Sequence, residues 1–175
     1  MKQINGIDID ELRGVIAAAA EDPRKAERDP VVRARWVGGD RAELTMASGG
    51  APVYIGGDDA PGAMRMLLMS MAACDVDVIA TRASLLGIEI ESLSVEATGH
   101  FNVQRYLGLD VPVGPGYERI GYTVRLKTRG ATPEQLEELR VACEADSPVG
   151  DTLKRHVEVT LDFRGDDTHT TASAG

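Results

Sequence analysis

The sequence predicts an α+β fold, in which antiparallel strands and helices form separate blocks. Short stretches of alternating apolar and polar residues are joined by glycine-rich turns, which favours antiparallel pairing of neighbouring strands. One segment, residues 63–86, is apolar over much of a helical circumference and predicts a long buried helix. The expected order is a helix, three strands, the long helix, two strands, two helices and a last strand, which is typical of the α+β class.

Residues 1–30 predict an N-terminal helical extension. Asp8 and Glu11 have the spacing of a helix-capping pair, and Pro23 follows the expected last turn. The apolar residues between these points recur at helical spacing: Leu12, Val15, Ile16 and Ala19. Because this stripe is narrow, we expect the helix to lie against a larger body.

Three short strands are expected after this extension. Alternation over residues 32–36 and 42–46 predicts a hairpin, since the glycine-rich turn at residues 38–40 separates the two stretches. A third strand is predicted at residues 53–55.

The long helix is predicted from Ala63 to Leu86, and Gly87 is the residue type favoured just beyond a helix C-terminus. A helix that is apolar nearly all round is buried on most sides, so we expect a sheet and a partner subunit to cover it. Strand character returns over residues 88–101, where a phase shift at Ser92 predicts a bulge. A long loop, residues 102–116, follows.

The C-terminal third predicts a strand at residues 120–126 and a helix over residues 133–145 that begins with a Thr-Pro-Glu-Gln capping sequence. A short helix is expected from Ser147-Pro148 to Arg155. Residues 157–163 alternate and predict the last strand. Residues 164–175 are small and polar and predict a disordered tail.

Composition and charge limit the classes of partner. The 28 acidic and 19 basic residues give a formal net charge of −9, which argues against binding to nucleic acid or to an anionic membrane surface. No uncharged apolar stretch approaches the ~20 residues of a membrane span, and the first residues lack the apolar core of a signal peptide. We therefore expect a cytoplasmic protein whose two cysteines are not a disulfide framework.

The sequence contains no recognised metal or cofactor motif. His100, His156 and His169 are far apart and have no ligand-type neighbours at close spacing, so we expect neither a metal nor a cofactor. Asp75 and Asp77 lie in the long apolar helix, two positions apart and therefore on different faces. We expect both to be solvated or paired charges.

Cys74 stands among small residues in the middle of the long helix. An inert buried thiol is the commonest fate of a free cysteine. A reactive thiolate at this place, several turns from the helix N-terminus, needs an arginine or a similar cation from elsewhere in the molecule.

The segment Leu67–Cys74 (LLMSMAAC), followed about seventy residues later by Ser147-Pro148-Val149, closely resembles the two signatures of the OsmC/Ohr family of osmotically inducible and organic-hydroperoxide-resistance proteins. The similarity extends over roughly residues 31–163, which we interpret as an OsmC-like domain. The family normally has Cys-Pro-Val at the second signature, so Ser-Pro-Val indicates a divergent branch. The resemblance implies an intertwined homodimer in which antiparallel sheets wrap around long central helices, with active sites at the subunit interface.

In the peroxidase members of this family, one cysteine attacks a hydroperoxide oxygen and a second resolves the resulting sulfenic acid as a disulfide. By resemblance, Cys74 matches the attacking cysteine, while Ser147 stands where the resolving cysteine is expected and cannot form a disulfide. Arg41 matches the family's activating arginine. Where the family has a glutamate, this chain has Met64-Arg65, and Arg65 offers a second source of positive charge.

The resemblance thus implies a one-cysteine, thiol-dependent reductase of organic hydroperoxides or other small electrophiles in oxidative-stress defence, with an external thiol as reductant. Cys143, four residues before Ser147, is either a displaced resolving cysteine or a core residue, and its apolar helix face favours the core. The alternative function is a non-enzymatic dimer that binds a small apolar ligand in a methionine-lined cavity. A purely structural dimer is a third possibility.

Overall fold

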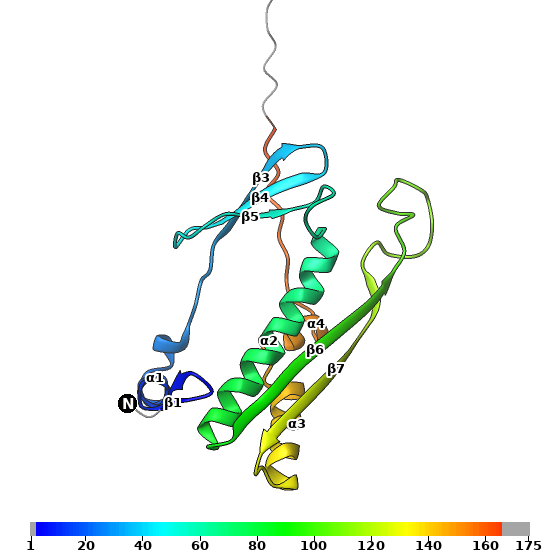
Figure 1. Ribbon diagram of the computed structural model, residues 1–175. Helices are drawn as coiled ribbons and strands as arrows, with labels where there is room; N and C mark the ends of the chain where they lie inside the picture. Colours follow the sequence, from blue (N-terminus) through cyan, green and yellow to red (C-terminus); the bar gives the residue numbers. More distant parts are fainter. Residues whose placement is uncertain (1–2, 166–175) are drawn as a thin grey trace, which may run out of the picture.

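A computed structural model describes residues 3–165 and confirms the α+β architecture with antiparallel sheets (Figure 1). Its elements, in chain order, are β1 (Gln3–Ile4), β2 (Ile7–Asp8), α1 (Ile9–Glu21), the 3₁₀ turn η1 (Pro23–Ala26), β3 (Val32–Gly38), β4 (Arg41–Met46), β5 (Val53–Ile55), α2 (Ala63–Leu85), β6 (Glu89–Phe101), β7 (Tyr117–Arg129), α3 (Pro133–Ala145) and α4 (Pro148–Lys154).

The body of the protein is the long helix α2, which lies along the β6–β7 hairpin and also contacts α3 and α4 (Figure 1). The hydrophobic core sits where the C-terminal part of α2 meets α3 and the start of β6. Its buried centre is Ala83, Ile88 and Leu139, joined by the partly buried Leu86, Ile90, Leu126 and Ala131.

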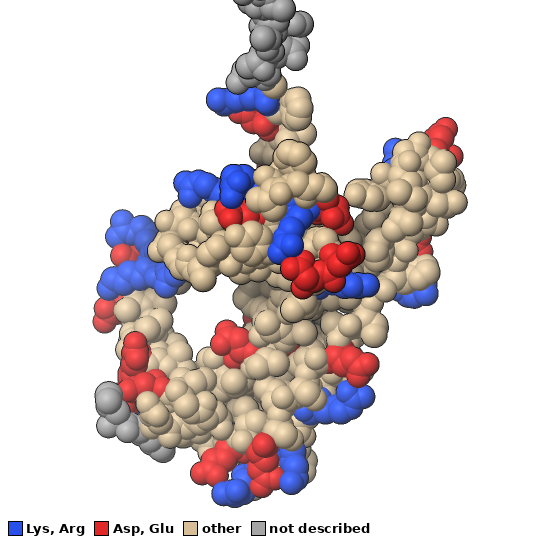
Figure 2. Space-filling model, turned by 45° about the horizontal axis from the view of Figure 1, so that its top comes forward, with Lys and Arg blue, Asp and Glu red and all other residues tan. Residues whose placement is uncertain are grey.

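The β3–β4–β5 sheet lies beyond the N-terminal end of α2 and away from this core (Figure 1). Its central strand is β4, and both pairings are antiparallel. Large apolar side chains on the sheet are exposed, with Trp36 at 73%. In Figure 2 an opening passes between the N-terminal segment and the body. This half of the molecule therefore lacks the covering layer that its apolar residues require.

The predicted helical extension is present as α1, and Asp8 caps it by accepting hydrogen bonds from the backbone N–H groups of Asp10 and Glu11. A two-stranded hairpin, β1–β2, precedes it and was not predicted from the sequence. Asn5 at the turn of this hairpin has a positive φ of 52°. Its amide bonds to the Ser84 hydroxyl and to the backbone at Ile88 and Ile90, which ties the extension to the end of α2.

Most local predictions are confirmed. Gly87 follows α2 with φ 76°, and Thr132 and Gln135 form the full capping box of α3. The phase shift at Ser92 is a register shift in the β6–β7 pairing between Ile90 and Ser92. The loop between the two strands occupies residues 102–116, as expected.

The prediction of a last strand over residues 157–163 is wrong. These residues form no strand, and Val159, Leu161 and Phe163 are 88%, 85% and 85% exposed. Alternation gives a segment the side-chain pattern of a strand, but a strand also needs a neighbouring edge to complete its hydrogen bonds, and this segment lies along none within the chain. The predicted disordered tail lies outside the described residues except for positions 164 and 165.

Candidate functional site

Cys74 and Ser147 are brought together by the packing of α4 against α2. The Ser147 hydroxyl donates to the Cys74 sulfur over 3.4 Å, although 73 residues separate them in sequence. Ser147 is 1% exposed, whereas Cys74 is half-buried. The two sequence signatures therefore meet at one thiol, which accepts a hydrogen bond from a hydroxyl.

Ser147 is held in place by the first turn of α4. It is the N-cap residue, and its hydroxyl oxygen accepts a hydrogen bond from the Gly150 N–H over 3.2 Å. A Cβ at Gly150 would lie 3.1 Å from both Cβ and Oγ of Ser147, so the turn fits closely around this side chain. Because the oxygen accepts from the backbone, the hydroxyl proton is free to point toward the sulfur.

The two predicted arginines are not at this thiol. Arg41 makes an ion pair with Asp59, with contacts of 3.0 and 3.1 Å to its two carboxylate oxygens, and lies over the ring of Tyr54. Arg65 is exposed, and its side chain has no hydrogen bond or ion pair within residues 3–165. Of the four predicted site residues, the fold unites Cys74 and Ser147 and leaves both arginines apart in the single chain.

A largely apolar cavity of about 430 Å³ lies one helical turn from Cys74. Met64, Leu67 and Met71 form its α2 wall. Five residues of β7 form another side: Tyr117, Glu118, Arg119, Ile120 and Tyr122. The Tyr117 hydroxyl donates to the Met64 carbonyl over 2.8 Å and fixes the strand against the helix. This cavity is of the size and character that accept a small apolar molecule.

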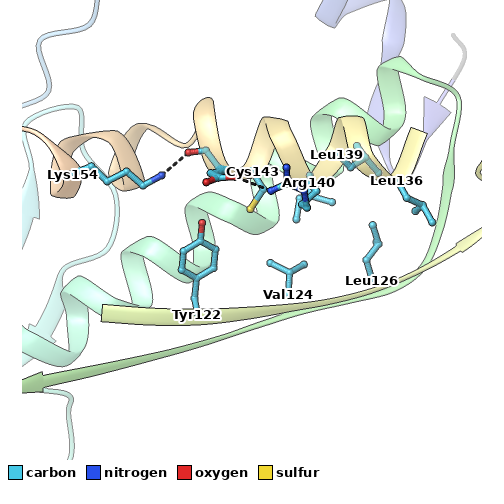
Figure 3. Close-up of a pocket in the computed structure, with 10 residues that line it drawn as sticks. Tyr122, Val124, Leu126, Leu136, Leu139, Arg140, Cys143 and Lys154 are labelled. Atoms are coloured by element: carbon cyan, nitrogen blue, oxygen red, sulfur yellow. Dashed lines mark hydrogen bonds and ion pairs between the residues drawn. The ribbon is translucent and has the colours of Figure 1, made fainter. Parts of the chain in front are cut away.

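A second cavity of about 650 Å³ separates α3 from β7 (Figure 3). Its lining is mainly aliphatic along Val124, Leu126 and Leu136, and Figure 3 shows the Tyr122 hydroxyl pointing toward Cys143 at its polar end. Cys143 is only 5% exposed and faces this strand, in agreement with the expectation that it is a core residue.

Asp75, expected to be solvated or paired, is neither. Its side chain is 0% exposed, and both carboxylate oxygens lack a hydrogen-bond partner in the part of the chain that the structure describes. Burial, with a smaller contribution from Asp75, raises the pKa of the Cys143 thiol to about 11. Burial also raises the pKa of Tyr122, with the charges of Cys143 and Asp75 acting in the same direction.

Sequence reasoning missed Asp75, although a signal was present. Four of the five buried residues of α2 recur every four positions: Met71, Asp75, Ile79 and Ala83. Asp75 therefore lies on the helix stripe that faces the protein interior, whereas Asp77 is exposed. A helical-wheel reading of the apolar positions on either side would have placed this carboxylate inside.

Two further findings limit the classes of site. Within residues 3–165, no group of three or more histidine, cysteine, aspartate or glutamate side chains is arranged to hold a metal ion. No helix in the same range is both long and apolar enough to cross a bilayer.

Comparison with known proteins identifies the family. The model of the family described as OsmC-like protein matches residues 56–162. A solved OsmC-like protein from Mycoplasma pneumoniae has a TM-score of 0.61 at 14% identity, covering 73% of this chain and 89% of that chain. An OsmC-like protein of unknown function from Vibrio cholerae has a TM-score of 0.59 at 9% identity, covering 72% and 94%.

A third solved structure, described as an organic hydroperoxide resistance protein OsmC from Legionella pneumophila, has a TM-score of 0.51 at 16% identity and covers 73% of this chain and 90% of that chain. A search of curated proteins found no match. At these identities the solved structures establish the fold, and the family match spans more than half of the sequence. The chain belongs to the OsmC-like protein family.

Proposed function

We propose that this protein is a one-cysteine, thiol-dependent reductase of organic hydroperoxides, with Cys74 as the reacting residue. The Cys74 thiolate attacks the outer oxygen of the hydroperoxide, the O–O bond breaks, and the alkoxide leaves as an alcohol after taking a proton. Cys74 becomes a sulfenic acid. One external thiol then forms a mixed disulfide and releases water, and a second regenerates Cys74.

The observation that carries this proposal is the 3.4 Å contact between the Ser147 hydroxyl and the Cys74 sulfur. A hydroxyl donor stabilises negative charge on sulfur, which favours the attacking thiolate. A hydroxyl cannot form a disulfide, so Ser147 does not resolve the sulfenic acid. We propose that a thiol from outside the chain reduces it, and such a cycle fits a reducing compartment such as the cytoplasm.

The cavity of about 430 Å³ supports an organic substrate over hydrogen peroxide. The last residue of its α2 wall, Met71, is three positions before Cys74 on the same helix. An apolar wall contributes binding energy only when the substrate has an apolar group to bury. Small electrophiles with an apolar group are accommodated by the same chemistry.

We also propose that the working unit is a homodimer. Support comes from the uncovered side chains of Trp36, Leu161 and Phe163, which are 73%, 85% and 85% exposed. Monomeric proteins rarely expose apolar groups on this scale. Arg41 lies on the sheet that stands away from α2, so its proposed role in activating Cys74 requires this assembly. Light scattering at micromolar concentration should give twice the chain mass, and a stable folded monomer would contradict the assembly.

The test of the activity is consumption of cumene hydroperoxide in the presence of a dithiol, comparing the wild type with Cys74→Ser. We expect the variant to lose at least 100-fold in rate, because serine is a far weaker nucleophile. Cys143→Ala is the matched control and should keep its rate within about twofold. Equal rates in the wild type and Cys74→Ser would refute the proposal.

The alternative is a non-enzymatic binding protein, and the two largely apolar cavities favour it over a purely structural dimer. A binding protein holds an apolar dye or alkyl alcohol equally well with and without Cys74. Hydroperoxide turnover that depends on Cys74 separates the two functions.

A further inference from the structure

The N-terminal extension, described from residue 3 to 26, precedes the part of the chain that the family match covers, residues 56–162. Its helix α1 carries the apolar stripe that the sequence predicts: Leu12, Val15, Ile16 and Ala19. This stripe is poorly covered, because Ile9 is the one buried residue of α1, and Val15 and Ile16 are 54% and 47% exposed. The helix therefore presents an apolar face that its own subunit does not bury.

The hairpin before α1 is nevertheless held firmly on the body. The Asn5 amide donates to the Ser84 hydroxyl over 3.0 Å and to the Ile88 carbonyl over 2.9 Å. The amide oxygen accepts from the Ile90 N–H over 2.9 Å. Because these bonds fix the turn that leads into the helix, the uncovered stripe of α1 has a defined place beside the end of α2.

A groove of about 420 Å³ separates the stripe of α1 from the C-terminal half of α2. Leu12 and Ile16 line one side, and Val78 and Leu85 of α2 line another. Three exposed charged side chains lie along the same groove: Asp77, Arg82 and Asp146. In Figure 2 the molecule is open between its N-terminal segment and its body. Apolar walls accompanied by exposed charged side chains are typical of a surface that binds another protein.

The surface area of the chain favours a second copy of itself as the occupant. The chain exposes 13308 Å², whereas a folded monomer of 18.7 kDa exposes about 8,300 Å². The excess of roughly 5,000 Å² is several times the ~800 Å² that each partner buries in a standard interface. A small ligand in one groove does not account for so large an excess, whereas a second copy has large apolar surfaces of its own to bury.

We propose that α1 is an arm that docks on the partner subunit of the homodimer. Val15 and Ile16 are then buried in the contact, and an apolar segment of the second copy fills the groove between α1 and α2. Since Asn5 anchors the arm to its own subunit, the contact made by α1 adds to the attraction between the subunits. This inference rests on the homodimer proposed above and is independent of the chemistry of Cys74.

The first experiment identifies what lies against Ile16. In a Cys74→Ser, Cys143→Ala background, Ile16→Cys is labelled with a benzophenone maleimide and irradiated. A denaturing gel should show a product of twice the chain mass, because the stripe faces the second copy. Ala17→Cys, which is exposed and turned away from the stripe, is the matched control and should give roughly fivefold less of this product. An Ile16→Cys label that links only within its own chain overturns the proposal.

The second experiment measures what the contact contributes to the dimer. Unlabelled and isotopically labelled dimers are mixed, and native mass spectrometry follows the formation of mixed dimers. Ile16→Asp places a charge in the contact and should speed this exchange at least about tenfold, because interface changes act mainly on dissociation. Ala17→Asp adds the same charge to the same helix outside the contact and should exchange within about twofold of the wild type.

Both substituted positions are exposed in the single chain, and a cooperative thermal melt establishes folding for each variant. A folded Ile16→Asp protein that is wholly monomeric supports the proposal as an accelerated exchange does. Equal exchange rates for Ile16→Asp and Ala17→Asp overturn it.

Light scattering of the wild type separates this inference from the homodimer on which it rests. A wild-type protein of single chain mass refutes the homodimer and the arm together. A wild type of twice the chain mass, in which the Ile16→Cys label stays within its own chain, refutes the arm alone. Neither result alters the test of Cys74 by hydroperoxide consumption.

Discussion

The surroundings of Cys74 differ from those of Cys143 in exposure, in the nearest polar group and in nearby charge. Cys74 is half-buried and receives a hydrogen bond from the Ser147 hydroxyl. Cys143 is buried and lies beside the enclosed carboxylate of Asp75. Burial, with a smaller contribution from Asp75, raises the pKa of the Cys143 thiol, whereas the Cys74 sulfur is partly exposed and accepts from a hydroxyl. The comparison teaches that packing gives the two thiols of one chain different surroundings, because α4 brings a hydroxyl to Cys74 while the interior encloses Cys143.

The largest effect is expected from Ser147→Cys, which places a thiol at the position of the hydroxyl beside Cys74. We expect a disulfide with Cys74 after treatment with hydroperoxide, because the present side-chain atoms are already in contact. Non-reducing mass spectrometry checks the bond, and the Cys74→Ser, Ser147→Cys double variant is the control. A Cys74 that remains a sulfenic acid in Ser147→Cys shows that the two residues do not approach in solution as they do in this structure.

The raised pKa of Cys143 should lower the free energy of unfolding at alkaline pH. The folded-state pKa of Cys143 is about 11 and its ordinary value is 9.0. Between these values the unfolded chain has lost the proton and the folded chain still holds it, so stability falls as pH rises. This group alone should remove roughly 1–2 kcal/mol of unfolding free energy by about pH 10.5.

Urea unfolding of the wild type and Cys143→Ala at neutral and alkaline pH measures this loss. The alanine variant should show a smaller fall in unfolding free energy, and Cys74→Ser provides the matched comparison. Identical pH dependence in the wild type and Cys143→Ala would contradict the raised pKa.

Ser147→Ala removes the hydroxyl donor without adding a thiol. The rate of hydroperoxide consumption should fall about tenfold, which corresponds to one hydrogen bond to a charged sulfur. The same change removes the N-cap of α4 and should cost about 1 kcal/mol of stability. The rate is therefore measured well below the melting temperature, and Thr152→Ala, elsewhere in α4, is a control that should leave it unchanged.

The smallest expected effect comes from Gly150→Ala. The added Cβ would meet Ser147 at 3.1 Å, so the hydroxyl must shift by a few tenths of an ångström. We expect a rate about threefold lower, because the Ser147–Cys74 contact is already long at 3.4 Å. A wild-type rate in this variant shows that activity tolerates displacement of Ser147 and weakens its proposed role.

Local sequence signals were sufficient for most of the fold. Periodicity located α2 and the β6–β7 strands, and the Thr132–Gln135 spacing gave the start of α3. These features depend on residues a few positions apart, which is why sequence alone predicts them. The strand expected at residues 157–163 failed because its hydrogen-bonding edge is not a local property.

For the candidate site, too, some features follow from the sequence and others only from the tertiary structure. The sequence by itself determined that Cys74 and Ser147 belong together, because both lie in signatures that resemble one family. Only the tertiary structure decided that they touch, that Arg41 pairs with Asp59 in the single chain, and that Asp75 is enclosed next to Cys143. Contact, burial and pKa depend on which distant elements meet, and no spacing along the chain specifies those distances.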